Sequence, residues 1–315
     1  MDEKRKFIID TDTAGDDAAA IMLAVRSGAA DVLGVTVAAG NVSLEQGMKN
    51  ALAALELVGS DAPVFPGAEK PLNGEDKPVF SVYGKDGMGD CGLISPKGRP
   101  QDKNAVDFIL ETVAKYPGQV EILALAPVTN IALAIQKDPG TMKLVKRIWS
   151  MGSAGLGPGN ATPVAEFNVY KDAPAYKVML DLGCPVTVIG LDRDGPDTWI
   201  SGERLAGLKN GSAAQRFFAA SFSGLLEFKR GNGIDAVDIP DGTAAACALW
   251  DGYMTETTLC HASCITDPGE CYGQVIFYKS GFHYDSEPPR GVENVELVTG
   301  AKDAEFAEKL IAALE

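Results

Sequence analysis

Short runs of apolar residues alternate with longer amphipathic stretches along the chain, and this alternation limits the folds that the chain can adopt. The short runs are apolar at nearly every position, which is typical of strands that are covered on both faces of a parallel sheet. We therefore expect an α/β fold with an open, Rossmann-like and mostly parallel central sheet, flanked by helices, and a site at the strand carboxyl ends. The expected strands are residues 7–10, 31–37, 120–126, 147–151, 186–190 and 274–278.

Local signals predict where several of the helices lie. Residues 16–27 begin with two aspartates, whose negative charge suits the positive N-terminus of a helix. Ser43 and Gln46 have the spacing of a capping box for a helix that runs to about residue 58. In the segment 104–116, the apolar residues fall on one helical face.

The length and composition suit one large globular domain. The chain has 315 residues, of which 46% are hydrophobic, so there is enough apolar material for a sizeable core. No stretch has the composition of an interdomain linker, and we expect a single domain over residues 1–315. The segments 66–100 and 151–163 are rich in Gly and Pro and are expected to be long loops, which are often functional in a compact domain.

Charge and cysteine content narrow the function and the compartment. Asp and Glu number 43 against 28 Lys and Arg, so the net charge is −15 and neither nucleic acid nor an anionic membrane is an expected partner. The two histidines leave little room for a catalytic triad or a His-rich zinc site. The N-terminal apolar run is too short for a signal peptide or a membrane span. The six cysteines are too sparse for a disulfide scaffold, so we expect a cytoplasmic protein with reduced thiols.

Four carboxylates follow the first expected strand within eight positions: Asp10, Asp12, Asp16 and Asp17. The first two would point to the same side of an extended chain, and the last two would lie in the first turn of the next helix. Four close anions repel one another unless they are protonated or share a cation, and Ca²⁺ and Mg²⁺ prefer oxygen ligands. The plainer interpretation, with two helix-capping and two solvated aspartates, explains this spacing less well than a cation site.

Two classes of enzyme could use this acidic segment. Its start resembles the Asp-x-Asp motif of haloacid-dehalogenase-type phosphatases, in which the first aspartate is phosphorylated beside Mg²⁺. Such phosphatases also need a later acidic pair, and the candidate segment 190–194 contains no adjacent Asp-Asp pair. The longer pattern Asp-x-Asp-x-x-x-Asp-Asp-Ala is similar to the start of the nucleoside hydrolases.

The resemblance to nucleoside hydrolases continues at separate points along the chain. An Ala-Gly-Asn turn, a Pro-Val-Thr-Asn-Ile-Ala segment, an Ala-Glu-Phe-Asn loop and a Glu-Cys-Tyr-Gly segment follow one another in the family's order. A late aspartate also opens an alanine-rich helix. Motif matches that share an order are more specific than any one alone. The matching segments are 37–41, 125–132, 151–152, 159–160, 165–168, Asp241 and 270–273.

The resemblance implies Ca²⁺-dependent hydrolysis of ribonucleosides to free base and ribose, by a homodimer or a homotetramer. It implies that Ca²⁺ is held by Asp12, Asp17, the backbone carbonyl of Thr129 and Asp241. Asp12 would also act as the general base that takes a proton from the attacking water. Asp10 would brace this loop from behind.

The resemblance also implies a set of substrate contacts. Asp16, Asn41 and Asn168 would hydrogen-bond the ribose diol, and Asn160 and Glu166 would hold the 5′-hydroxyl. Plainer roles stay open for several residues: the two glycine-following asparagines could be turn residues, Glu166 a solvated loop residue, and Thr129 the N-cap of the next helix. The whole expected substrate-binding set is Asp16, Asn41, Tyr83, Met151, Asn160, Glu166, Phe167 and Asn168.

The chain departs from the family where the base would bind. Tyr83 stands where many relatives have histidine, and it could stack on a base or donate a proton. Pro240 precedes the late aspartate, where relatives have histidine or tryptophan, so the usual acid and the usual aromatic partner are both missing. This leaves open a third alternative, a ribose- or nucleoside-binding protein without catalysis. By resemblance, 217–235 would supply a mobile helix over the pocket, and its candidate base contacts are Phe222, Phe228, Lys229, Arg230 and Asp235.

The remaining Cys, His and Trp residues are expected to have no role in the site. Cys260, His261, Cys264 and Cys271 suggest a zinc site, but they lack a Cys-x-x-Cys pair, so we favour buried thiols. His283 is expected in an exposed loop. The indoles of Trp199 and Trp250 are expected to be packing residues.

Overall fold

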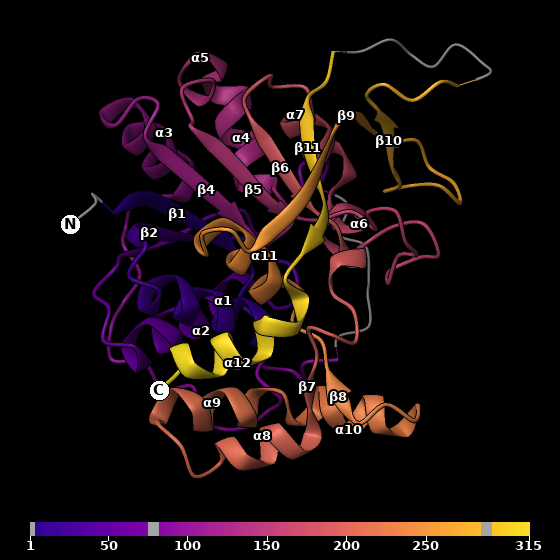
Figure 1. The fold of residues 1–315 in the computed structure, drawn as a ribbon. Coiled ribbons are helices and arrows are strands. Elements are labelled where there is room, and N and C mark those ends of the chain that lie inside the picture. The colour runs from indigo at the N-terminus through magenta and orange to yellow at the C-terminus, as the bar shows by residue number, and fades with distance from the viewer. Residues whose placement is uncertain (1–3, 75–81, 285–291) are drawn as a thin grey trace.

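The computed structural model describes residues 4–74, 82–284 and 292–315. Within these ranges nine strands form one sheet with helices on both faces, in the order β10-β9-β11-β6-β5-β4-β1-β2-β3 (Figure 1). The strands β6, β5, β4, β1, β2 and β3 run parallel to one another. β11 pairs parallel with β6, and β9 and β10 add an antiparallel edge. The predicted mostly parallel sheet is therefore confirmed. The strands are β1 (Arg5–Thr11), β2 (Ala30–Val37), β3 (Val64–Pro66), β4 (Val120–Ala124), β5 (Arg147–Met151), β6 (Val186–Ile189), β9 (Met254–Cys264), β10 (Val275–Lys279) and β11 (Val295–Ala301).

Each parallel strand contributes to two separate hydrophobic cores, because successive side chains point to opposite faces of the sheet. In β1, Phe7 and Ile9 belong to one core and Ile8 to the other. Helices α1 (Gly15–Arg26), α2 (Leu44–Leu57), α11 (Pro240–Leu249) and α12 (Phe306–Ala313) supply the first core. The second core is covered by α3 (Ala105–Lys115), α4 (Thr129–Lys137), α5 (Pro139–Met142), α6 (Phe167–Lys171) and α7 (Ala173–Leu180).

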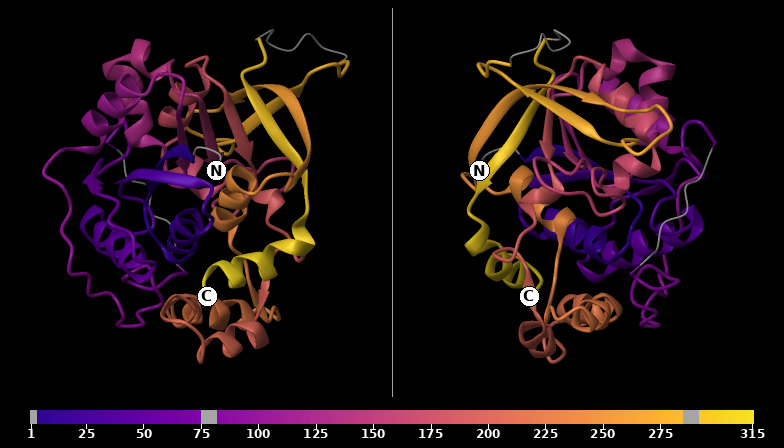
Figure 2. Two further views of the ribbon diagram at one scale, coloured as in Figure 1. Left: turned by 60° about the vertical axis from the view of Figure 1, so that its left-hand side comes forward. Right: turned by 90° about the vertical axis from the view of Figure 1, so that its right-hand side faces the viewer.

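Three further helices form a separate group beside α12 and the C-terminus (Figures 1 and 2). Their buried residues, among them Phe217, Phe218 and Phe222, extend the first core. A two-stranded antiparallel ribbon, β7 (Ile200–Ser201) and β8 (Ala236–Val237), brackets the group in the chain. The helices are α8 (Gly202–Leu208), α9 (Ala213–Ser221) and α10 (Ser223–Gly231).

The predicted helices are present with small differences. The predicted helix 16–27 corresponds to α1, which begins at Gly15, and the predicted helix 104–116 corresponds to α3. Ser43 caps α2 by accepting a hydrogen bond from the Gln46 backbone N–H at 3.3 Å. The Gln46 side chain donates to Asn50 Oδ1 at 2.9 Å instead of closing the capping box.

The sequence prediction missed β3, β7, β8, β9 and β11 and extended β4 by two residues beyond its end at Ala124. The predicted loops contain no helix between residues 82 and 100 or between 152 and 163, and residues 75–81 lie outside the described ranges. No helix in the described part of the chain is long and apolar enough to cross a bilayer. The parallel strands β1, β2, β4, β5 and β6 all end at one edge of the sheet, and the loops that follow them build the site.

Candidate functional site

A cavity of about 490 Å³ lies at the carboxyl ends of the parallel strands. Its wall combines polar side chains from the strand-end loops with apolar side chains from α10 and its surroundings. The structure places all eight expected substrate-binding residues on this wall: Asp16, Asn41, Tyr83, Met151, Asn160, Glu166, Phe167 and Asn168. Sequence reasoning did not assign the other lining residues Val82, Leu125, Ala161, Leu191, Leu225 and Asp238.

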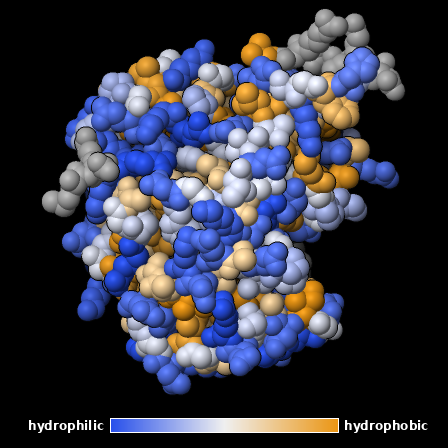
Figure 3. All heavy atoms as spheres, viewed as in Figure 1, coloured by the Kyte–Doolittle hydropathy of each residue, from blue (hydrophilic) through white to orange (hydrophobic). Residues whose placement is uncertain are grey.

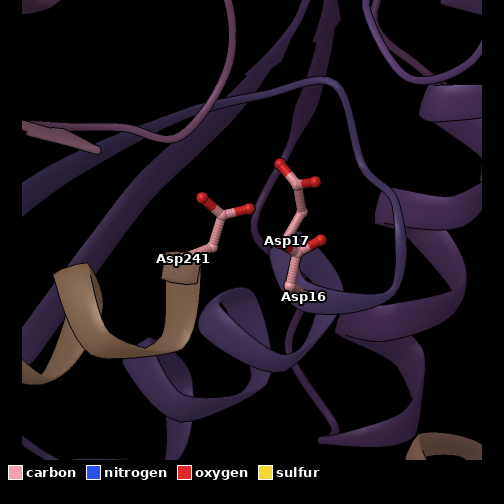
Figure 4. Close-up of side chains that lie close together, drawn as sticks. All are labelled: Asp16, Asp17 and Asp241. Carbon is pink, nitrogen blue, oxygen red and sulfur yellow. The ribbon is translucent and has the colours of Figure 1, made fainter. Parts of the chain in front are cut away.

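Carboxylates from two helix N-termini meet beside the cavity (Figure 4). Asp16 and Asp17 come from the first turn of α1, and Asp241 comes from the first turn of α11. One oxygen from each of the three lies within 4.8 Å of the others, an arrangement that could hold a metal ion. The two helices contact each other, and each contains a run of three fully buried alanines, residues 18–20 and 244–246. These small side chains let the two helix starts approach closely.

Asp12 is fully buried and lies outside this trio, but its charge acts on both Asp17 and Asp241. Its Oδ2 accepts a hydrogen bond from the Asn41 backbone N–H, and its Oδ1 has no hydrogen-bond partner among the described residues. The pKa of Asp12 is raised to about 7. Burial is the main cause, the charges of Asp16 and Glu166 also raise the pKa, and the hydrogen bond from the Asn41 N–H partly offsets them. We refer to Asp12, Asp16, Asp17 and Asp241 as the acidic cluster.

The loop that carries the acidic cluster is fixed by hydrogen bonds within it. The Thr11 hydroxyl donates to Asp17 Oδ1 at 2.6 Å, and the Ala14 N–H donates to Asp17 Oδ2 at 2.9 Å. Asp17 therefore closes the N-terminus of α1 with its own carboxylate. Thr13 has a φ of 24°, so the chain turns through the left-handed region between β1 and α1.

Asp10 lies behind this loop and does not line the cavity. Its Oδ1 accepts hydrogen bonds from the Thr36 hydroxyl at 2.6 Å and from Asn130 Nδ2 at 2.8 Å. Burial raises the pKa of Asp10 to about 6, although both hydrogen bonds lower it. Asp10 thus connects β1 with β2 and α4, which is the geometry that a bracing role requires.

Thr129 is buried at the start of α4, and Val128 rather than Thr129 is the N-cap of that helix. The Thr129 hydroxyl donates to Asp172 Oδ2 at 2.6 Å. Asp172 in turn caps α7 by accepting from the Ala175 N–H at 3.1 Å. The N-cap interpretation of Thr129 is therefore wrong, since its side chain ties α4 to α7.

Glu166 is buried, so the interpretation of a solvated loop residue is wrong. Its carboxylate caps α6 by accepting from the N–H groups of Asn168 at 2.7 Å and Val169 at 3.2 Å. Burial raises its pKa to about 7, against the lowering effect of these hydrogen bonds. Asn168 Nδ2 donates to the Leu125 carbonyl at 2.8 Å, which leaves its Oδ1 buried and without a partner among the described residues. Asn160 Oδ1 accepts from the Phe167 N–H at 2.9 Å, and neither Asn41 nor Asn160 has the positive φ of a left-handed turn residue.

Three buried oxygen atoms of the site have no hydrogen-bond donor among the described residues. Besides Asp12 Oδ1 and Asn168 Oδ1, the buried Asp16 Oδ1 also has no hydrogen-bond partner in the described part of the chain. Burial and the neighbouring carboxylates raise the pKa values of Asp16, Asp17 and Asp241 well above the ordinary range. A set of carboxylate and carbonyl oxygens without nitrogen or sulfur fits Ca²⁺ or Mg²⁺ and does not fit Zn²⁺.

Tyr83 reaches the cluster from the other side of the cavity. Its hydroxyl donates a hydrogen bond to the Asp16 carboxylate, and its ring packs edge-to-face on Phe222 with the ring centroids 6.3 Å apart. Burial raises the pKa of Tyr83 well above its ordinary value, and the charges of Asp16 and Asp238 add to the effect. Tyr83 is therefore a neutral donor toward the acidic cluster.

Only two of the five candidate base contacts line the cavity in the described structure. Phe228 and Lys229 do so from α10, whereas Phe222 is fully buried behind Tyr83. Arg230 and Asp235 pair with each other at 2.6 Å away from the cavity. With Leu225, Asp238 and Pro240, the two lining residues form what we call the α10 wall of the cavity.

The cysteines and tryptophans lie apart from the acidic cluster. Cys260 and Cys264 are buried thiols on β9, as expected, but Cys271 is exposed, so that expectation is wrong for Cys271. The acidic trio of Asp16, Asp17 and Asp241 is the one metal-type cluster within residues 4–74, 82–284 and 292–315, so no zinc site is found there. The Trp250 ring packs on Tyr253, whereas the Trp199 ring faces the Lys229 ammonium, beyond the packing role expected of it.

Comparison with known proteins gives a consistent result over most of the chain. The family model described as "Inosine-uridine preferring nucleoside hydrolase" matches residues 7–308. Uridine nucleosidase 1 of Arabidopsis thaliana is 41% identical over 194 residues, which are 61% of this chain and 58% of that protein. The match therefore spans less than two thirds of the length of that relative. Pyrimidine-specific ribonucleoside hydrolase RihB of Escherichia coli strain SE11 is 30% identical over 282 residues, 87% of each chain.

Solved structures resemble the whole molecule. The plant nucleoside hydrolase PpNRh1 superposes with a TM-score of 0.91 at 31% identity and covers 99% of both chains. A purine-preferring ribonucleoside hydrolase from Gardnerella vaginalis superposes with a TM-score of 0.88 at 26% identity and covers 98% of both chains. The named relatives thus include both pyrimidine-specific and purine-preferring proteins.

Proposed function

Because the chain belongs to the family of inosine-uridine preferring nucleoside hydrolases, we propose that it hydrolyses the N-glycosidic bond of ribonucleosides with the help of bound Ca²⁺. The products are the free base and ribose. The observation that carries this proposal is the buried acidic cluster beside the cavity, in which Asp12 Oδ1 and Asp16 Oδ1 have no hydrogen-bond donor among the described residues. Neutral ribonucleosides suit such a pocket better than substrates that carry phosphate, since the pocket is already anionic.

The proposed reaction requires positive charge to develop on the sugar. As the bond from C1′ to the base nitrogen breaks, its electron pair goes to the base, and the ribosyl group becomes cationic. Water then adds its oxygen to C1′ and loses a proton, and the base gains one. Carboxylates around the sugar stabilise the cationic transition state.

Asp12 is the proposed general base of this reaction. Its Oδ1 is free of hydrogen bonds among the described residues, so this oxygen is available to take up a proton. The Asn41 N–H holds the other oxygen, so the carboxylate has a fixed orientation. Asp10 braces the same loop through β2 and α4.

Asp12, Asp17, Asp241 and the backbone carbonyl of Thr129 are the proposed ligands of the ion. When bound, Ca²⁺ would supply positive charge that offsets the carboxylate repulsion and lowers the pKa of nearby water. Asp16, Asn41 and Asn168 would orient the ribose diol, and their side chains line or flank the same wall. Glu166 and Asn160 would hold the 5′-hydroxyl, with Met151, Phe167 and Tyr83 completing the enclosure.

The phosphatase alternative is weaker, because its nucleophile would be Asp10. That carboxylate lies behind the cavity wall and already accepts hydrogen bonds from Thr36 and Asn130. Of the later acidic residues, Asp194 is buried and accepts hydrogen bonds from Thr198 and Ile239. No second acidic pair therefore faces Asp10 from this segment.

A panel of ribonucleosides tests the proposed function. Reducing-sugar release is measured with Ca²⁺ and again after chelation, for the unchanged chain, Asp12→Ala and the control Asp107→Ala, whose carboxylate is exposed and pairs with Lys137. We expect Asp12→Ala to lower kcat by about a thousandfold or more and the control to keep full activity. Phosphate release from a phosphomonoester would favour the phosphatase, and ribose binding without turnover of any nucleoside would favour a binding protein.

The cellular setting is part of the same proposal. We place the enzyme in the cytoplasm, which the sparse cysteines support, as a homodimer or a homotetramer, which the resemblance supports. Light scattering of the purified chain measures the mass in solution, and a monomer would contradict the oligomer. Fractionation of the source cells checks the compartment.

A further inference from the structure

Lys229 and Asp238 form an ion pair in the α10 wall of the cavity. Lys229 Nζ lies 2.5 Å from Asp238 Oδ1, and their side chains are 14% and 29% exposed. Among the described residues that line the cavity, Lys229 is the only Lys, Arg or His. The pair therefore places the one positive side chain of this wall in a cavity that is otherwise anionic.

The ammonium of Lys229 is held in place from behind. It lies 4.5 Å from the centroid of the Trp199 ring, a distance typical of a cation–π contact. Trp199 Nε1 donates to Asp194 Oδ2 at 3.2 Å, and Asp194 Oδ1 accepts from the Ile239 N–H at 3.2 Å. Three separate segments thus fix the direction in which Lys229 points.

Apolar side chains surround the pair on the same wall. Leu225 and Phe228 come from α10, and Pro240 comes from the first turn of α11. Such a surface suits the flat face of a nucleobase, whereas the ion pair suits its polar edge. Besides burial and the charge of Asp17, the charge of Asp238 contributes to the raised pKa of Asp16, so the pair lies within electrostatic range of the acidic cluster.

We propose that Lys229, held by Asp238 and Trp199, contacts the departing base and stabilises the negative charge that the base gains in the reaction. This inference rests on the proposed function of the same cavity. When the bond from C1′ to the base nitrogen breaks, the electron pair passes into the base ring, and an exocyclic oxygen carries part of the charge. Pro240 has no donor for that oxygen, whereas the Lys229 ammonium has three N–H groups and a full positive charge.

The pair also distinguishes between kinds of base. An ammonium only donates and a carboxylate only accepts, so side by side they match a carbonyl oxygen next to a ring N–H. A base with an amino group next to a ring acceptor would present a donor to Lys229 and an acceptor to Asp238. Each mismatch would leave a desolvated polar group unsatisfied. Bases with a carbonyl oxygen next to a ring N–H, such as uracil and hypoxanthine, are therefore the ones that gain most from Lys229 and Asp238.

Substitution of Lys229 by methionine tests this role, since methionine has a similar length and no charge. We expect Lys229→Met to lower kcat/KM for uridine and inosine by about 100-fold. Hydrolysis of p-nitrophenyl β-D-ribofuranoside should change by less than about threefold, because its leaving group already stabilises negative charge. Lys229→Arg should restore most of the activity toward uridine. Asp238→Asn should lower the ratio of kcat/KM for uridine over cytidine.

Lys309→Met is the matched control, because Lys309 also pairs with a carboxylate, Glu305, at 2.6 Å and lies 5.5 Å from the Trp250 ring centroid. Its activity toward every substrate should equal that of the unchanged chain. An equal loss toward uridine and the nitrophenyl riboside in Lys229→Met would overturn the inference, as would no loss toward either. A chain that hydrolyses no riboside at all contradicts the proposed function instead. In that case, calorimetry tests the inference. Lys229→Met must bind uridine more weakly than the unchanged chain does and bind ribose equally well. Equal affinities of the two chains for uridine would overturn the inference.

Discussion

Tyr83 is a single residue at which the cavity of this chain differs in chemistry from what the family resemblance predicts. From the family resemblance, histidine is expected at this position, and a histidine can carry a proton at neutral pH. Tyr83 is neutral and donates its hydroxyl to Asp16, one of the proposed ribose contacts. This geometry predicts that Tyr83 positions the Asp16 carboxylate and closes the cavity, rather than exchanging a proton.

Removal of that hydroxyl gives a prediction at the residue scale. Tyr83→Phe keeps the ring that packs on Phe222 and deletes the donor to Asp16. Because Asp16 then loses part of its orientation, we expect kcat/KM for ribonucleosides to fall by about tenfold, mainly through KM. Steady-state kinetics measure the change, and Tyr116→Phe, a half-buried residue away from the cavity, is the control. An unchanged KM in Tyr83→Phe would refute the positioning role.

The site residues that could be predicted from the sequence are those that lie close together in it. Asp12, Asp16 and Asp17 follow one strand and start one helix, so local geometry alone brings them to the strand end. Lys229 and Asp238 meet only because α10 packs beside β8. The sequence also could not say that Phe228 faces the cavity and Phe222 the core, since that choice depends on the packing of α9 against α10.

The turn between β2 and α2 matters at the scale of elements, because it holds Asp12. A side chain at Gly40 would place its Cβ only 2.1 Å from Asp12 Oδ2. The absence of a side chain lets the Asn41 N–H approach the carboxylate. The Ala-Gly-Asn motif of this turn therefore has a direct structural explanation.

Gly40→Ala should move the Asp12 carboxylate out of its position. We expect kcat to fall by about 100-fold, since a displacement of about an ångström at a catalytic group has that effect. Gly207→Ala on α8 is the matched control, because a Cβ there would meet nothing within 4 Å. Kinetics and thermal unfolding are measured for both variants. Equal activities of the two variants would show that this turn does not fix Asp12.

The elements that the sequence predicted well are the strands buried on both faces. Apolar residues make up most of the predicted ranges of β1, β2, β5 and β6, and the structure places these strands near the predicted bounds. β9 was missed because the first half of Met254–Cys264 is mostly exposed and polar, so it contains no apolar run. β3 is three residues long, which is too short to give a pattern.

The whole molecule carries a large excess of negative charge, and most of it is on the surface. The face seen in Figure 3 is mostly hydrophilic, with hydrophobic residues in small separate groups. The acidic cluster is different, because its carboxylates are buried and their pKa values are raised. Its contribution to stability therefore depends on pH and on a bound cation.

Without metal, the protein should lose stability as the pH rises from about 4 to about 7. Asp12 and Glu166 have pKa values of about 7 in the folded protein, whereas the unfolded chain releases these protons near pH 4. The folded state binds more protons than the unfolded state in that window, so the free energy of unfolding decreases there by on the order of a few kcal/mol. Thermal unfolding in a chelator, scanned from pH 5 to pH 8, measures this decrease.

Addition of Ca²⁺ at pH 8 should restore the midpoint of unfolding, because cation binding favours the ionised carboxylates of the folded state. Glu166→Gln should flatten the pH profile in chelator, since it removes one of the titrating groups. Glu111→Gln, at an exposed glutamate that pairs with Lys103, should leave the profile unchanged. A midpoint in chelator that does not vary with pH would contradict the coupling.

The two sides of the cavity come from different parts of the chain. The acidic cluster and the ribose contacts come from the loops after β1, β2 and β5 and from the start of α11, whereas the α10 wall comes almost entirely from residues 225–240. Substitutions confined to that short stretch are expected to change the preferred base and to leave the acidic cluster and the proposed ribose contacts unaltered. Related chains can therefore differ in the base that they prefer and still share the same acidic cluster.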